Sequence, residues 1–166
     1  MKIVVSDTGP LLHLREAECL DLLPELGQIV IPPAVRAEIQ ALDPSWLEEP
    51  PKWVAVRDLT PESSARSRAW QSARVLDRGE AEAFELVRQV EADWLLTDDA
   101  AARILAQEAG FEVHGSLGVV LWAAATGRYS FEAATRVLGA LFDSSLWISE
   151  RVRASAEAAL GEIFAG

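Results

Sequence analysis

Short apolar runs recur along the chain, and each is closed by polar or turn-forming residues. The first run, Ile3–Val5, is β-branched throughout and stops at Ser6-Asp7. Runs of this kind are typical of strands that are buried on both faces of a parallel sheet. They predict five strands, at Ile3–Val5, Gln28–Ile31, Trp53–Val56, Trp94–Thr97 and Phe111–His114.

Amphipathic segments lie between these runs and predict helices. Pro33 is well placed to begin one helix, and Gly110 to end another. Strands that alternate with helices favour an α/β fold with a central parallel sheet, right-handed crossovers and helices on both faces. The polar stretch 60–78 is also permissive for a helix, whereas 43–52 is proline-rich and is expected to be a loop. The predicted helices are Leu11–Leu23, Pro33–Gln40, Gly79–Glu91, Ala100–Ala109, Leu117–Thr126, Phe131–Phe142 and Ser149–Phe164.

Composition indicates one folded domain over residues 1–166. The chain is 50% hydrophobic, which excludes a disordered or low-complexity protein. Its 15 Lys and Arg against 26 Asp and Glu give a net charge of −11. This charge argues against a broad basic surface that coats nucleic acid. Any nucleic acid would have to be bound locally or through metal ions.

Cysteine and histidine are too scarce for a disulfide framework or a zinc site. Cys19 is the single cysteine, and the only histidines are His13 and His114, which we expect to be structural. The N-terminal apolar run is too short for a signal peptide, and the longest run, Val119–Ala125, is far short of the roughly 20 residues that a membrane span needs. We therefore expect a cytoplasmic protein without a membrane partner.

Carboxylates fall where the predicted fold would place a ligand. Asp7 closes the first strand, and the Asp98-Asp99 pair closes the strand Trp94–Thr97. Ligands of such sheets bind at the carboxyl ends of the strands, so these acids are expected at one edge. Two helical acids share a stripe with apolar residues and are expected to face inward. These are Glu38 and Glu80, and we expect Glu80 to lean toward the core more than Glu82 or Glu85 does.

Each acid also has a purely structural explanation. Asp7 could form a turn, Asp98 or Asp99 could cap a helix, and the two glutamates could be solvent-exposed or favour a helix dipole. Together, however, inward-facing acids on four segments would repel one another unless a cation lay between them. Oxygen donors without Cys or His select Mg²⁺ or Mn²⁺. Such ions suit phosphodiester hydrolysis.

Five motifs in order resemble a known family. They are the stretch from Val4 to Leu11, Val30–Val35 leading to Glu38-Ile39, the stretch from Leu76 to Ala83, Trp94–Asp99 with Arg103, and the stretch from Gly115 to Leu121. Together they resemble the DUF3368 branch of the PIN-domain superfamily, over residues 1 to about 130. The resemblance implies a PIN-like three-layer α/β/α core of about 1–130 with additional C-terminal helices at about 131–166. It also implies a Mg²⁺- or Mn²⁺-dependent ribonuclease of the VapC-like kind, which acts as the toxin of a toxin–antitoxin pair and is bound by a small antitoxin protein.

The resemblance also assigns residues. Carried over position by position, the catalytic and metal-binding acids are Asp7, Glu38, Glu80 and either Asp98 or Asp99. Thr97 and Glu82 are secondary candidates, since Thr97 could orient a water or could simply be a strand residue. Gly9 departs from the serine that is usual in this branch, which removes a hydroxyl contact there. Four arginines at near-helical spacing could form an RNA-binding rim or a solvated face. They are Arg66, Arg68, Arg74 and Arg78.

Other functions fit less well. A haloacid-dehalogenase-like phosphatase needs a second acid two residues after Asp7, where this chain has Gly9. A receiver domain has its acid pair at the first strand, not late in the chain. An inactive PIN scaffold that binds a protein partner remains an open alternative. The apolar residues of the segment 131–164 further suggest a homodimer.

Overall fold

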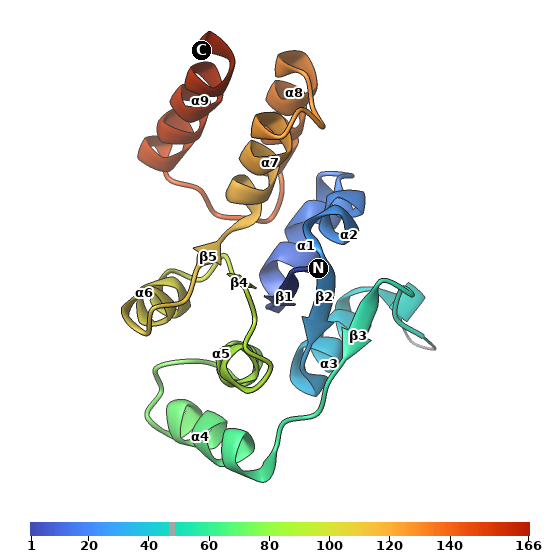
Figure 1. Ribbon diagram of the computed structural model, residues 1–166, viewed down its shortest axis with the longest axis vertical. Coiled ribbons are helices and arrows are strands. Elements are labelled where there is room, and N and C mark those ends of the chain that lie inside the picture. Colours follow the sequence, from blue (N-terminus) through green and yellow to red (C-terminus); the bar gives the residue numbers. More distant parts are fainter. Residues whose placement is uncertain (47–48) are drawn as a thin grey trace.

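The computed structural model describes residues 1–46 and 49–166, and a five-stranded sheet lies at its centre (Figure 1). All strand pairs are parallel, and the strand order is β3-β2-β1-β4-β5. The chain therefore leaves β1 toward one side and later continues from β4 toward the other, so the strand order reverses between these two neighbours. Open parallel sheets bind ligands in the crevice at such a reversal. The strands are β1 (Ile3–Ser6), β2 (Gln28–Ile31), β3 (Val54–Val56), β4 (Trp94–Leu96) and β5 (Val113–His114).

Successive side chains along the strands enter two different cores. Val4 belongs to one apolar cluster and Val5 to the other, and Trp94 and Leu95 divide in the same way. This alternation follows from the two-residue period of a strand. Because both faces are buried, the strands are apolar at nearly every position, which is why the runs were recognisable in the sequence.

Helices cover the two faces as the α/β prediction requires, which confirms the fold class. On one face lie α1 (Thr8–Glu16), α2 (Leu23–Leu26), α3 (Pro33–Leu42) and α7 (Ser116–Ala125), and on the other α5 (Arg78–Gln89) and α6 (Ala100–Glu108). Figure 1 shows α4 (Pro61–Ser72) outside α5, and shows α8 (Phe131–Phe142) and α9 (Glu150–Ala165) beside α7. Leu138, Leu141 and Leu160 of these last helices join the apolar cluster of the first face.

One predicted helix is wrong in its bounds. The segment Leu11–Leu23 is not continuous: α1 begins three residues earlier and ends at Glu16, and a short 3₁₀ turn (Leu20–Leu22) leads into α2. Asp7 caps α1, and Glu18 has a φ of 57°, which breaks the helix. The expected loop 43–52 contains a 3₁₀ turn at Pro44–Trp46, and positions 47 and 48 lie outside the described residues.

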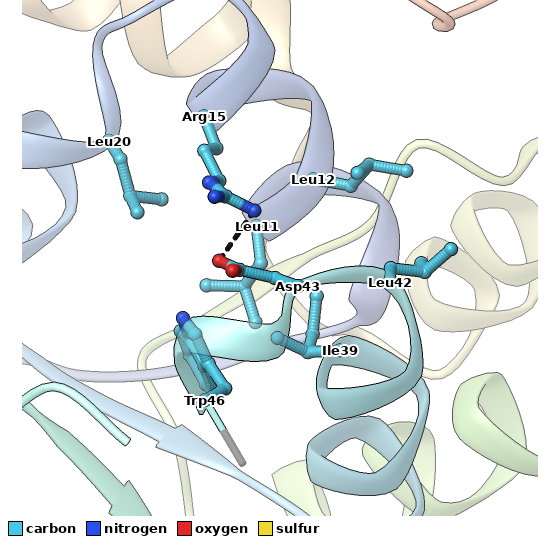
Figure 2. Close-up of a pocket in the computed structure, with 8 residues that line it drawn as sticks. All are labelled: Leu11, Leu12, Arg15, Leu20, Ile39, Leu42, Asp43 and Trp46. Atoms are coloured by element: carbon cyan, nitrogen blue, oxygen red, sulfur yellow. Dashed lines mark ion pairs between the residues drawn. The ribbon is translucent and has the colours of Figure 1, made fainter. Parts of the chain in front are cut away.

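The C-terminal ends of α1 and α3 are tied together by an ion pair. Figure 2 shows Arg15 reaching the carboxylate of Asp43 beside Leu11, Ile39 and Trp46. The Arg15 Nη1 lies 2.5 Å from the Asp43 Oδ2. Burial alone would raise the pKa of Asp43, but hydrogen bonds from Ser45 and the Arg15 guanidinium outweigh it and hold the pKa below its ordinary value. These contacts fix α3, which carries Glu38, against α1, which begins directly after Asp7.

Within the described ranges, no helix has both the length and the apolar character needed to cross a bilayer.

Candidate functional site

Asp7 lies where β1 ends and α1 begins, and the residue is almost fully enclosed, with 6% exposure. One oxygen accepts the Thr8 backbone N–H at 2.7 Å, and the other accepts the Thr97 hydroxyl at 3.1 Å. Burial raises the pKa of Asp7 to about 7; nearby carboxylates add to this shift, and the two hydrogen bonds oppose it. Asp7 is therefore a rigidly held acid that is poorly solvated as an anion.

Glu38 reaches the same place from α3. Its carboxylate accepts the hydroxyl of Thr8, the residue that follows Asp7. It also lies directly over Gly79 of α5, where an added Cβ would come within 2.6 Å of both carboxylate oxygens. The glycine in the stretch Asp77–Glu80 thus leaves the space that the Glu38 carboxylate occupies.

Glu80 is positioned by the start of α5. Its backbone N–H donates to Asp77 at 2.8 Å, while its own carboxylate accepts the Asp77 N–H at 2.9 Å, so the two residues form a capping box. Burial raises the pKa of Glu80 to about 7, and the charges of the surrounding carboxylates contribute to the rise. Burial is thus the main cause of the raised pKa, and repulsion from the neighbouring acids adds to it.

Asp98 and Asp99 follow β4 but have different partners. Asp98 is engaged through both oxygens: it contacts His13 Nδ1 at 2.7 Å and accepts the hydroxyl and the N–H of Ser116, at 2.6 and 2.7 Å. Asp99 caps α6 with one oxygen, which accepts the Ala102 N–H at 2.8 Å. In the described part of the chain its second oxygen makes no hydrogen bond or ion pair.

Thr97 connects the two strand ends from below the surface. It is fully buried, donates its hydroxyl to Asp7 and accepts the Asp99 N–H at 3.2 Å. A backbone hydrogen bond from Asp7 N–H to Leu96 reinforces this link. Thr97 therefore holds the acids in place and does not line the cleft.

These groups meet in one cleft of about 450 Å³ at the carboxyl ends of β1 and β4. The structure brings together every acid that the sequence nominated as catalytic: Asp7, Glu38, Glu80, Asp98 and Asp99. Two further titratable residues line the cleft and were not among the predicted site residues, namely Asp77 and His13. The capping-box spacing of Asp77 and Glu80 could have signalled the first, whereas no local pattern marks His13.

Other acids of α5 face elsewhere. Glu82 accepts the Ala34 N–H at 2.9 Å and pairs with Arg78, so it joins α5 to the start of α3 and does not line the cleft. Glu85 is fully buried, which corrects the expectation that Glu80 is the more inward of the two. Its carboxylate accepts hydrogen bonds from Arg66 and from the Trp70 indole.

The four arginines for which the sequence left a rim or a solvated face open do not line the cleft. Arg66 is paired with Glu85 at 2.7 Å and Arg78 with Glu82 at 3.3 Å, while Arg68 donates to Ser64. These arginines lie on or beside α4 and at the start of α5, and the cleft is lined by none of the four.

The donor set of the cleft suits a divalent ion in its chemistry. The cleft offers carboxylate oxygens, two of them with a raised pKa, and the space over Gly79 leaves Glu38 free of steric conflict. These are the donors that Mg²⁺ and Mn²⁺ select. Within the described residues, however, no three acidic, histidine or cysteine side chains already surround a single point. The donors therefore fit such an ion in kind, and the acidic side chains would have to move closer together to surround it.

The fold and the cleft define an α/β protein with an acidic site at its topological switch point. The chain matches the family model described as DUF3368, PIN domain, over residues 3–162, and it belongs to this family. PIN domains are generally nucleases that bind RNA and use divalent metal ions. The match continues past residue 130 into α8 and α9. A search of curated proteins gave no match.

Proposed function

We propose that this protein is a Mg²⁺- or Mn²⁺-dependent endoribonuclease. The observation that supports this most strongly is the convergence of Asp7, Glu38, Glu80 and Asp99 in one cleft beside the strand-order reversal. Carboxylates gathered in this way destabilise the empty cleft, and a bound cation relieves the repulsion. Bound divalent ions would supply an activated water and neutralise charge that builds on a phosphate.

The chain's own residues would divide the work. Asp7, Glu38 and Glu80 would hold the ions, and Asp99 would join them through its second oxygen. Asp98 has both oxygens occupied by His13 and Ser116, so we assign it a positioning role. Thr97 would keep Asp7 and Asp99 in register. The proposal thus favours Asp99 over Asp98 as the ligand.

Cleavage of a labelled single-stranded RNA tests the activity. We expect products in Mg²⁺ or Mn²⁺, none in EDTA, and opening of a circular RNA, which requires internal cleavage. Glu80→Gln should abolish the reaction, whereas Glu82→Gln, on the same helix but outside the cleft, should retain it. Wild-type protein that leaves both RNAs intact in either metal would refute the proposal.

An inactive scaffold that binds a protein partner is the second candidate. The observation in its favour is that no three side chains of the described ranges already form an ion cage. The two candidates predict opposite results in the cleavage assay. If the protein is only a scaffold, wild type and Glu80→Gln should both leave the RNA intact.

We further propose that the nuclease is the cytoplasmic toxin of a type II toxin–antitoxin pair. Its only cysteine, Cys19, is buried and unpaired, which suits a reducing compartment. Induced expression should arrest growth, and Asp7→Asn should relieve the arrest. A small neighbouring gene for a DNA-binding protein should encode the antitoxin, and co-expression of that protein should restore growth.

We also propose a homodimer, although the structure leaves less exposed apolar surface for it than the sequence suggested. Leu138, Leu141 and Leu160 are already buried inside the protomer. Phe131 and Phe164 stay 44% and 43% exposed and stack edge to face, with ring centroids 5.7 Å apart. Sedimentation at micromolar concentration should show about twice 18.1 kDa. A purely monomeric species would refute the dimer.

A further inference from the structure

A second hollow adjoins the acidic cleft and has a different lining. It measures about 480 Å³ and lies between α6 and the segment 143–149 that joins α8 to α9. We call it the side groove. It shares Asp98, Ala100, Leu146 and Trp147 with the acidic cleft, so the two hollows are continuous. Among the residues that the structure describes, Asp98 is the one carboxylate in its lining.

Trp147 stands at the junction of the two hollows. Its side chain is 84% exposed, and in the described part of the chain no hydrogen bond, ion pair or ring contact holds the indole. The backbone that carries it is nevertheless anchored on both sides. Ser145 donates its N–H and hydroxyl to Glu16 of α1, at 2.8 and 2.5 Å, and Ser149 caps α9. The indole is thus presented to solvent by a fixed segment.

Arg103 supplies the positive charge of the side groove. It is the one cationic residue among the groove's lining residues, and its guanidinium makes no ion pair or hydrogen bond within the described ranges. It lies against Gly115, where an added Cβ would come within 2.5 Å of the Arg103 Nη1. The nearby Asp98 is already occupied by His13 and Ser116. The charge of Arg103 is therefore available to an anion.

We propose that the side groove binds an unpaired nucleotide of single-stranded RNA, with its base stacked on Trp147 and its phosphate at Arg103. The inference rests on the proposed ribonuclease function and names the part of the substrate that leaves the cleft. A strand that crosses the acidic cleft needs an exit that does not repel its backbone. The side groove offers a cation and an open aromatic face, the two elements with which proteins bind single strands without reading sequence.

Binding of a short fluorescent single-stranded RNA, followed by anisotropy, tests this inference. The measurements use the Glu80→Gln background in Mn²⁺, so that the strand survives the titration. Trp147→Ala should raise the Kd about tenfold or more, and Trp147→Tyr should stay within about threefold of the parent because it keeps a ring. Trp122→Leu removes a half-buried aromatic ring that lines neither hollow and should leave the Kd unchanged.

Two further arms test the contacts individually. An abasic nucleotide at the stacked position should weaken binding as much as Trp147→Ala, and combining the two should cost no more, because both remove one contact. Arg103→Gln should lower affinity and reduce the slope of log K against log salt by about one. Arg136→Gln, an exposed α8 arginine outside both hollows, should change neither.

The inference and the proposed function can fail separately. If wild type cleaves RNA but Trp147→Ala binds RNA as tightly as Trp122→Leu does, the side groove is not an RNA site and the nuclease assignment stands. If the side groove binds a polypeptide instead of RNA, Trp147→Ala will likewise leave RNA affinity unchanged, and this result overturns the inference. If RNA binding depends on Trp147 but wild type never cleaves, the groove assignment stands and the ribonuclease proposal falls.

Discussion

Replacing Asp7 with asparagine should stabilise the metal-free protein at pH 8, although Asp7 is the most enclosed acid of the cleft. Burial raises the pKa of Asp7 from its ordinary value of 3.8 to about 7. At pH values between these two pKa values, Asp7 keeps its proton in the folded protein but has released it in the unfolded chain. The stability linked to this proton is complete below about pH 4 and is lost as the pH rises to 7. At pH 8 the folded wild type therefore holds a poorly solvated anion.

The size of the effect follows from the shift. A change of about three pKa units corresponds to about 4 kcal/mol, at about 1.4 kcal/mol per unit. Asparagine keeps the acceptor for the Thr8 N–H, but the Thr97 hydroxyl must reverse and accept a hydrogen bond. This rearrangement costs about 1 kcal/mol. We expect Asp7→Asn to unfold with a free energy about 2–4 kcal/mol higher than wild type at pH 8 and close to wild type near pH 4.

Urea denaturation in EDTA from pH 4 to pH 8 measures this difference. The stability gap between Asp7→Asn and wild type should widen steadily as the pH rises. Asp143→Asn, which removes an exposed carboxylate outside the cleft, should reproduce the wild-type pH dependence. A gap that stays constant with pH, or a wild type that is the more stable protein at pH 8, would refute the reasoning about Asp7.

Three other predictions concern the cleft and its surroundings. Gly79→Ala should keep or raise the Tm, because alanine favours a helix more than glycine does, but it should reduce cleavage at least tenfold, because the added Cβ displaces the Glu38 carboxylate. The control Gly139→Ala, in open space on α8, should leave cleavage unchanged. Mn²⁺ at a hundredfold excess over its Kd should stabilise the fold by about 2.7 kcal/mol, and an unchanged melting midpoint in millimolar Mn²⁺ would count against an ion site. Glu85→Gln should lose about 1–3 kcal/mol in urea denaturation because Arg66 loses its charged partner, yet it should cleave RNA normally.

The sheet and the convergence of acids could be predicted because both follow from short-range patterns. Each strand is apolar at nearly every position, and the chain places Asp7 and Asp98-Asp99 directly after two of the strands. The rule that ligands bind at the carboxyl ends of parallel strands then brings these acids together. No side-chain contact had to be known for this step.

The orientation of Glu85 could not be predicted in the same way. A helical stripe identifies one inward face, but α5 is buried on two sides, by the sheet and by α4. Glu85 lies between α5 and α4, where Arg66 and Trp70 satisfy its carboxylate. A polar stretch such as 60–78 gives no sign that it will cover a charged residue.

The roles of Asp98 and Asp99 also depend on contacts that are distant in sequence. Asp98 is occupied by His13, 85 positions earlier, and by Ser116, 18 positions later. Asp99 uses a local N-cap bond and keeps one oxygen without a described partner. Adjacent residues with the same side chain cannot be separated without these tertiary contacts.

Single-turnover cleavage by a set of neutralised variants tests the central claim most directly. If Asp7 and Glu80 act as one ion-binding unit, then Asp7→Asn and Glu80→Gln should each slow cleavage of single-stranded RNA in Mn²⁺ about a hundredfold or more. The double variant should be scarcely slower than either single variant, because residues that act together are strongly non-additive. Wild-type rates in all three variants would contradict the assignment of the acidic cleft as the nuclease site.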